Sequence, residues 1–92
     1  MYKLIFTETY EKREKKFLKR HPELIERYKK ILRLLEFDPE HPSLSLHKLK
    51  GKFAGKYAVY ITRSYRILLT FAVTEKGIIL LDVGSHEEVY GK

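Results

Sequence analysis

The sequence predicts an α+β fold in a single domain, residues 1–92, with elements in the order β-α-α-β-β-β. Apolar residues recur at helical spacing between residues 7 and 37, whereas three short runs after residue 56 are rich in β-branched and aromatic residues. Helices grouped before strands are typical of helices that cover one face of a sheet. We therefore expect an antiparallel sheet with an N-terminal helical hairpin packed on one face.

The first half of the chain predicts one strand and two helices. The segment Tyr2–Phe6 is rich in β-forming residues. Thr7 follows it and can cap a helix over about 7–20, whose charged face carries mixed Lys, Arg and Glu. A His-Pro pair separates this helix from a second one over about 22–37, in which apolar residues recur at steps of three, four and seven. The short break predicts an antiparallel pair.

The second half predicts three strands joined by short turns. After two prolines and a loop, the strand-like runs are Tyr57–Thr62, Tyr65–Val73 and Ile78–Val83. The connections between the runs are short, which favours an antiparallel meander.

Composition limits the class of protein. The chain has 19 basic and 12 acidic residues, a net charge of +7, which favours a polyanionic partner. The alternative is that the lysines only keep a soluble domain dissolved. The sequence contains no cysteine, and its four histidines lack ligand spacing, so we expect neither a metal nor another cofactor. It shows no signal peptide and no membrane-spanning run, which agrees with a cytoplasmic protein.

The positive charge is least compensated between residues 41 and 74, where the chain has no Asp or Glu. Tyrosines and histidines accompany the cations there, and this combination suits a phosphate-rich ligand. The basic residues of the segment are Lys48, Lys50, Lys52, Lys56, Arg63 and Arg66.

Three positions suggest chemistry. His47 follows a loop and offers an imidazole for proton transfer, although a histidine there can also be an ordinary surface residue. Arg66 is the second residue of an apolar run, so its guanidinium needs either a bound anion or a carboxylate such as Asp82 or Glu87. His86 follows the last strand, where the alternative is an irregular C-terminus without a role.

Three short motifs carry a resemblance to a known family: Leu46–Gly51 (LHKLKG), Tyr65–Leu68 (YRIL) and Gly84–Tyr90 (GSHEEVY). With the order of elements, they make the chain resemble the RelE/ParE toxin superfamily, and within it the YafQ and YoeB type of ribosome-dependent mRNA interferase. The resemblance implies a RelE-like fold and the toxin role in a type II toxin–antitoxin system. Such a toxin enters the ribosomal A site, where a 2′-hydroxyl of the mRNA attacks the adjacent phosphate. A cognate antitoxin protein silences it.

The same resemblance implies roles for individual residues. His47 matches a base, Arg66 an arginine over the scissile phosphate, and His86 a C-terminal acid. The implied catalytic set is His47, Lys50, Arg66 and His86. The expected substrate-binding set is Lys48, Lys52, Lys56, Arg63, Tyr65 and Tyr90. The chain departs from YafQ-like relatives at two positions, with Tyr60 in place of a histidine and Ser64 in place of an aspartate.

Two other functions remain open at this point. One is a ParE-like toxin that inhibits DNA gyrase without being a nuclease, and the other is a plain nucleic-acid-binding module. His47, Arg66 and His86 count against the gyrase inhibitor, because a poison that only binds a protein has no need of an acid–base set.

Overall fold

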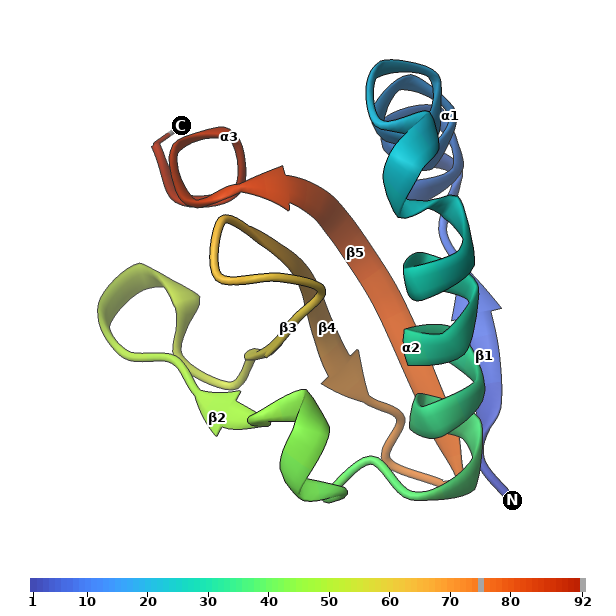
Figure 1. Cartoon of the computed structure of the whole chain (residues 1–92). Coiled ribbons are helices and arrows are strands. Elements are labelled where there is room, and N and C mark those ends of the chain that lie inside the picture. The colour runs from blue at the N-terminus through green and yellow to red at the C-terminus, as the bar shows by residue number, and fades with distance from the viewer. Residues whose placement is uncertain (75, 92) are drawn as a thin grey trace.

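Five strands form one mixed sheet in the computed structural model, which describes residues 1–74 and 76–91 (Figure 1). Their order across the sheet is β1-β5-β4-β3-β2. The strands are β1 (Lys3–Phe6), β2 (His47–Lys48), β3 (Tyr57–Tyr60), β4 (Tyr65–Phe71) and β5 (Gly77–Ser85). The α+β class and the order of the main elements are as the sequence predicts.

The pairing of β1 differs from the expected antiparallel sheet. β1 runs parallel to β5, whereas the other neighbouring pairs, β5–β4, β4–β3 and β3–β2, are antiparallel. Parallel neighbours need a long crossover connection, and the helices and strands between β1 and β5 provide it. The hairpin turns that orient β3, β4 and β5 therefore place no constraint on β1.

Two helices cover one side of the sheet, as predicted (Figure 1). They are α1 (Glu8–Arg20) and α2 (Ile25–Phe37), separated by a 3₁₀ turn at Pro22–Leu24. Thr7 caps α1, since its Oγ1 accepts a hydrogen bond from the Tyr10 N–H at 3.2 Å. The same hydroxyl donates to the Leu80 carbonyl at 2.7 Å and so ties the start of α1 to β5.

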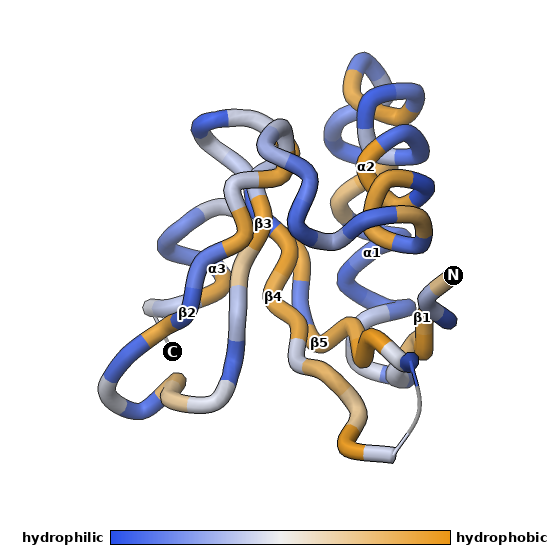
Figure 2. The backbone as a smooth tube through the Cα atoms, turned by 90° about the horizontal axis from the view of Figure 1, so that it is seen from below, coloured by the Kyte–Doolittle hydropathy of each residue, from blue (hydrophilic) through white to orange (hydrophobic). Residues whose placement is uncertain are grey.

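The main core lies between these helices and the sheet. Hydrophobic segments run along β3, β4 and β5, whereas β2 and the loop that follows it are mostly hydrophilic (Figure 2). A polar chain crosses the core: Tyr10 donates to the Tyr28 hydroxyl at 2.5 Å, and Tyr28 donates to Glu14 at 2.6 Å. Burial raises the pKa of both tyrosines, so they stay neutral donors.

Short elements partly cover the other face of the sheet. β2 forms where the sequence predicted only a loop, and α3 (His86–Tyr90) forms at the C-terminal exit. α3 packs on β4 and β5. Ala58 and Leu68 alternate along their strands with the core residues Val59 and Ile67, so they face this second side, where both are buried. No helix in the described part of the chain is long and apolar enough to cross a membrane.

Candidate active site

Arg66 lies on the second face of the sheet, as the second residue of β4. The residue is only 8% exposed, and its Nε has no hydrogen-bond partner among the residues that the structure describes. Nη2 donates one long bond of 3.4 Å to the Arg63 carbonyl. No carboxylate in residues 1–74 and 76–91 forms an ion pair with Arg66, and Asp82 pairs instead with Arg13. A buried cation without a counter-ion is costly, so this guanidinium suits a bound anion.

Two tyrosine rings contact this guanidinium. Its central carbon lies 4.9 Å from the ring centre of Tyr60 and 5.6 Å from that of Tyr90. Tyr60 is the cross-strand partner of Arg66, which places both side chains on one face. Tyr90 comes from α3, and its buried hydroxyl also lacks a hydrogen-bond partner in the described part of the chain. The rings fix the plane of the guanidinium through cation–π contacts.

The side chain of His47 reaches the same place from β2. Its ring stacks on Tyr60 with centres 5.4 Å apart and planes 28° apart. Nδ1 lies 2.8 Å from the Ser45 carbonyl oxygen. A carbonyl only accepts hydrogen bonds, so Nδ1 carries the proton. In the neutral form of the ring, the lone pair is then on Nε2, where it can accept a proton.

His86 is the first residue of α3. Its exposed ring contacts Tyr90 edge to face, with centres 4.7 Å apart. The contacts run from His47 through Tyr60, Arg66 and Tyr90 to His86. These five residues, which we call the Arg66 cluster, come from β2, β3, β4 and α3.

Two of the expected lysines border the cluster. The Nζ atoms of Lys52 and Lys56 lie 5.4 Å and 5.8 Å from the ring centre of Phe53, and the Phe53 ring is 5.3 Å from that of Tyr90. Phe53, which sequence reasoning missed, thus links these cations to the cluster. A phenylalanine among four lysines was the available signal, since cations gather over aromatic faces.

The remaining expected residues lie further out or on the other side. Lys48 and Lys50 are exposed, and Arg63 is an exposed residue of the turn between β3 and β4. Tyr65 packs under the helices, with its ring centre 5.4 Å from that of Phe17 and 4.5 Å from that of His21. Tyr65 and Arg66 are successive residues of β4, so they face opposite sides of the sheet.

The two departures from the relatives' pattern have different positions. Tyr60 stands at the centre of the cluster, in contact with both His47 and Arg66. Ser64 is exposed in the turn, where its N–H donates to Thr62 Oγ1 at 3.2 Å. Only the register between β3 and β4 reveals that Tyr60 lies beside Arg66, and the sequence does not state that register.

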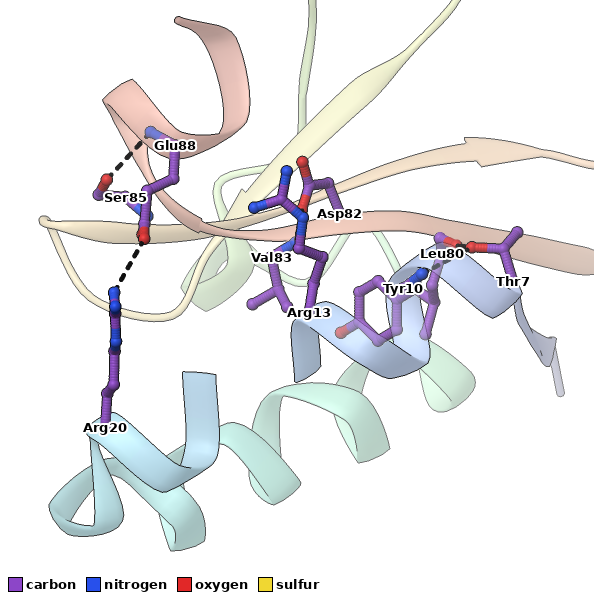
Figure 3. Close-up of polar contacts among 9 residues, drawn as sticks. All are labelled: Thr7, Tyr10, Arg13, Arg20, Leu80, Asp82, Val83, Ser85 and Glu88. Carbon is purple, nitrogen blue, oxygen red and sulfur yellow. Dashed lines mark hydrogen bonds and ion pairs between the residues drawn. The ribbon is translucent and has the colours of Figure 1, made fainter. Parts of the chain in front are cut away.

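A capping box positions α3 and therefore His86 and Tyr90 (Figure 3). Ser85 Oγ accepts from the Glu88 N–H at 3.1 Å, and Glu88 Oε1 accepts from the Ser85 N–H at 2.8 Å. The bond from Ser85 holds the pKa of Glu88 below its usual value. Gly84 leaves room for this carboxylate, because a Cβ there would lie 2.8 Å from Glu88 Oε1.

Helix α1 holds this arrangement from the other side (Figure 3). Arg20 Nη1 lies 3.6 Å from Glu88 Oε2, and Arg13 Nε lies 3.6 Å from Asp82 Oδ1. Burial raises the pKa of Asp82, while its bond from the Val83 N–H and the Arg13 charge oppose that shift. The two arginines connect α1 with α3 and β5.

The described residues contain no group of three His, Asp or Glu side chains that is arranged to hold a metal ion. The chemical groups that the site does offer are a desolvated guanidinium, an imidazole with a defined free nitrogen, a second imidazole and bordering lysines. This set matches the needs of proton transfer at a phosphate ester.

Comparison with solved structures supports the same fold. The crystal structure of YafQ from E. coli strain BL21(DE3) has a TM-score of 0.81 at 17% identity, covering 99% of this chain and 100% of that one. A YoeB/ParE toxin from Agrobacterium tumefaciens has a TM-score of 0.75 at 20% identity, covering 91% and 98%. The fold also recurs in the E. coli DinJ–YafQ toxin–antitoxin complex, with a TM-score of 0.79 at 20% identity and 98% of both chains covered.

The family assignment follows from the sequence as a whole. No curated protein matches the chain significantly. A family model described as "Bacterial toxin of type II toxin-antitoxin system, YafQ" matches residues 2–91, nearly the entire chain. Toxins of this family are endoribonucleases. The resemblance noted in the sequence is thereby confirmed, and the chain belongs to the YafQ family of bacterial toxins of type II toxin–antitoxin systems.

Proposed function

We propose that this toxin is a metal-independent endoribonuclease that cuts mRNA in the ribosomal A site. The observation that carries the proposal is the Arg66 cluster, in which a buried guanidinium contacts two tyrosine rings, and each of these rings contacts a histidine. Within residues 1–74 and 76–91 this guanidinium forms no ion pair with a carboxylate. A scissile phosphate against Arg66 would have one imidazole available on each side.

The proposed reaction needs no atom from outside the RNA and the protein. His47 Nε2 takes the proton of the 2′-hydroxyl, and the 2′-oxygen attacks the adjacent phosphorus. The bond from phosphorus to the 5′-oxygen breaks, and His86 gives a proton to that oxygen. The products are a 2′,3′-cyclic phosphate and a free 5′-hydroxyl. Acid–base assistance of this kind contributes about 10²–10⁴-fold in rate.

Arg66 supplies the electrostatic part of the mechanism. Negative charge grows on the phosphate oxygens in the transition state, and a cation in a dry site stabilises it more strongly than one in water. Its unpartnered Nε and the Tyr90 hydroxyl are both donors for phosphate oxygens. Lys50, three residues after His47, adds positive charge.

The basic residues around the Arg66 cluster would bind the RNA on either side of the scissile phosphate. Lys48, Lys52, Lys56 and Arg63 supply charge for rRNA and mRNA phosphates. Tyr90 offers an aromatic surface for a base. The proposal gives Tyr65 no substrate contact, since it packs beneath α1 on the opposite face.

Two partners follow from this function. The first is the ribosome with its mRNA, which places the toxin in the cytoplasm. The second is a cognate antitoxin of acidic or amphipathic character, because an exposed cationic surface needs a complementary cover. A toxin–antitoxin complex of the same fold, DinJ–YafQ, exists in E. coli. Purification from the native host should recover a small acidic partner with the toxin.

Single-turnover cleavage on programmed ribosomes tests the proposal. Arg66→Ala should lose about a hundredfold or more in rate, the scale of losing a preorganised charge donor. Its fold should persist, because the change removes a buried charge that has no ion-pair partner within residues 1–74 and 76–91. The matched control is Arg33→Ala, an exposed arginine of α2 outside the cluster, which should cleave normally.

Three results would contradict the proposal. Equal rates for the wild type and Arg66→Ala would remove Arg66 from the mechanism. Inhibition of gyrase supercoiling without any cleavage of ribosome-bound mRNA would favour the ParE-like alternative. A phosphorothioate at the scissile position should show no rescue by thiophilic metal ions, and such rescue would overturn metal independence.

A further inference from the structure

An open depression lies beside the Arg66 cluster and shares one residue, Tyr60, with it. Its volume is about 590 Å³, including space open to solvent. Tyr60, whose ring contacts Arg66, is also one of the residues that line the depression. The lining residues are Arg27, Ser43, Tyr60, Ile61, Thr62 and Arg63. They come from α2, from the 3₁₀ turn at Pro42–Leu44, and from the end of β3 with the turn that follows.

Arg27 is held in a defined position at this depression. Its Nε donates a hydrogen bond of 2.6 Å to the Ile61 carbonyl, which connects α2 with the residue that follows β3. This bond uses one of five guanidinium donors and leaves the two terminal nitrogens for a ligand. Neither Arg27 nor Arg63 forms an ion pair with a carboxylate within residues 1–74 and 76–91.

The other polar groups of the depression can also act as donors. Thr62 Oγ1 already accepts a bond from the Ser64 N–H at 3.2 Å, so its own proton is available to a ligand. Ser43 adds a second hydroxyl, and its N–H is bonded to His41 Nδ1 at 3.1 Å, which fixes the turn. Two cations and two hydroxyls without an acid suit a ligand that is rich in acceptor oxygens, such as a phosphate.

We propose that this depression is a second phosphate subsite, which binds the backbone phosphate next to the scissile one. The inference rests on the proposed function, because it assumes that the scissile phosphate lies against Arg66. The shared Tyr60 makes the two sites immediate neighbours, as consecutive phosphates of one RNA strand require. Arg27 is the central ligand, and its bond to Ile61 aligns it before the RNA arrives, which lowers the ordering cost of binding.

The test measures binding separately from cleavage. Ribosomes are programmed with an mRNA that carries a 2′-deoxy nucleotide at the attacking position, so the toxin can bind but not cut. In two further mRNAs, the phosphate on the 5′ or the 3′ side of the scissile one is an uncharged methylphosphonate. Wild-type toxin should bind one of these about tenfold more weakly, the scale of one charge-assisted hydrogen bond.

The variant Arg27→Gln should show the same tenfold loss on the fully charged mRNA and no further loss on the affected methylphosphonate. Such non-additive losses of affinity indicate that Arg27 contacts this phosphate directly. Arg27→Lys should recover part of the affinity. The matched control is Arg33→Gln, which removes an exposed arginine of the same helix outside the depression and should keep the full methylphosphonate effect.

The subsite would be overturned if the affinity losses caused by Arg27→Gln and by the methylphosphonate were additive at both neighbouring phosphates. It would also be overturned if the wild type did not bind the mRNA at all. A lower Tm of Arg27→Gln together with additive losses of affinity would show that Arg27 only stabilises the fold through its hydrogen bond to the Ile61 carbonyl. Cleavage of unmodified mRNA by the wild type is measured in parallel. If the wild type did not cleave but Arg27→Gln and the methylphosphonate still gave non-additive losses of affinity, the nuclease function would be rejected and the phosphate subsite kept.

Discussion

The imidazole of His47 is stacked on the ring of Tyr60, and the same ring contacts the guanidinium of Arg66. One aromatic side chain therefore sets the spacing between the proposed base and the proposed phosphate-binding group. Cross-strand pairing builds this arrangement, since β2 pairs with β3 at His47–Ala58 and β3 pairs with β4 at Tyr60–Arg66. Catalysis should depend on the ring of Tyr60 even though it is not expected to transfer a proton.

Replacement of Tyr60 tests this dependence. Tyr60→Ala removes both ring contacts, and a cation–π contact at a desolvated site is worth about 2 kcal/mol. We expect the single-turnover cleavage rate on programmed ribosomes to fall at least about tenfold. Tyr60→Phe keeps the ring and should stay near the wild-type rate. An equally large loss in Tyr60→Phe would assign the role to the hydroxyl instead.

The two histidines should produce opposite limbs of the pH profile. The base must be neutral and the acid protonated, so the cleavage rate should pass through a maximum between about pH 5.5 and about pH 9. His47→Ala should remove the acidic limb and His86→Ala the basic limb, with residual activity from Arg66. Single-turnover rates at saturating toxin report this directly. If both variants kept the complete bell, the two-histidine mechanism would be wrong.

The border lysines should affect binding more than chemistry. Lys56→Gln removes a cation beside Phe53. The salt dependence of ribosome binding should become shallower, by about 0.7 in the log–log slope for each single-strand phosphate that the variant no longer neutralises. The rate at saturation should be unchanged. Lys3→Gln, in the strand at the opposite edge of the sheet, is the charge-matched control and should keep the wild-type slope.

The carboxylate of Glu88 should make stability depend on pH. Its folded-state pKa is lowered mainly by the hydrogen bond from the Ser85 N–H. The contribution of this carboxylate to the free energy of unfolding is therefore fully present above the pKa that Glu88 has in the unfolded chain. It is lost as the pH falls through the lower pKa that Glu88 has in the folded protein. Asp82, whose pKa is raised, acts in the opposite sense but is present in both proteins compared.

Thermal unfolding provides the measurement. Between about pH 7 and about pH 3, the Tm of the wild type should fall by more than the Tm of Glu88→Gln. Glu87→Gln, one residue earlier on α3, is the control and should follow the wild type. Identical acid sensitivity in the wild type and Glu88→Gln would show that the capping box does not contribute to acid-dependent stability.

The sequence alone determines the elements that local periodicity encodes. The spacing of apolar residues predicted both helices, and the β-rich runs predicted β1, β3, β4 and β5 to within a few residues. The absence of acids from residues 41–74 identified the segment with uncompensated positive charge, and the short motifs indicated the family. Each of these signals lies within neighbouring residues, so no contact across the fold is needed to find it.

Only the tertiary structure decided how distant residues meet. Strand register places Tyr60 beside Arg66 and sends Tyr65 to the opposite face, because a shift of one residue exchanges the two faces of a strand. The parallel pairing of β1 with β5 depends on a crossover through most of the chain. Arg27 meets Ile61 for the same reason, since helix packing joins residues that the sequence separates.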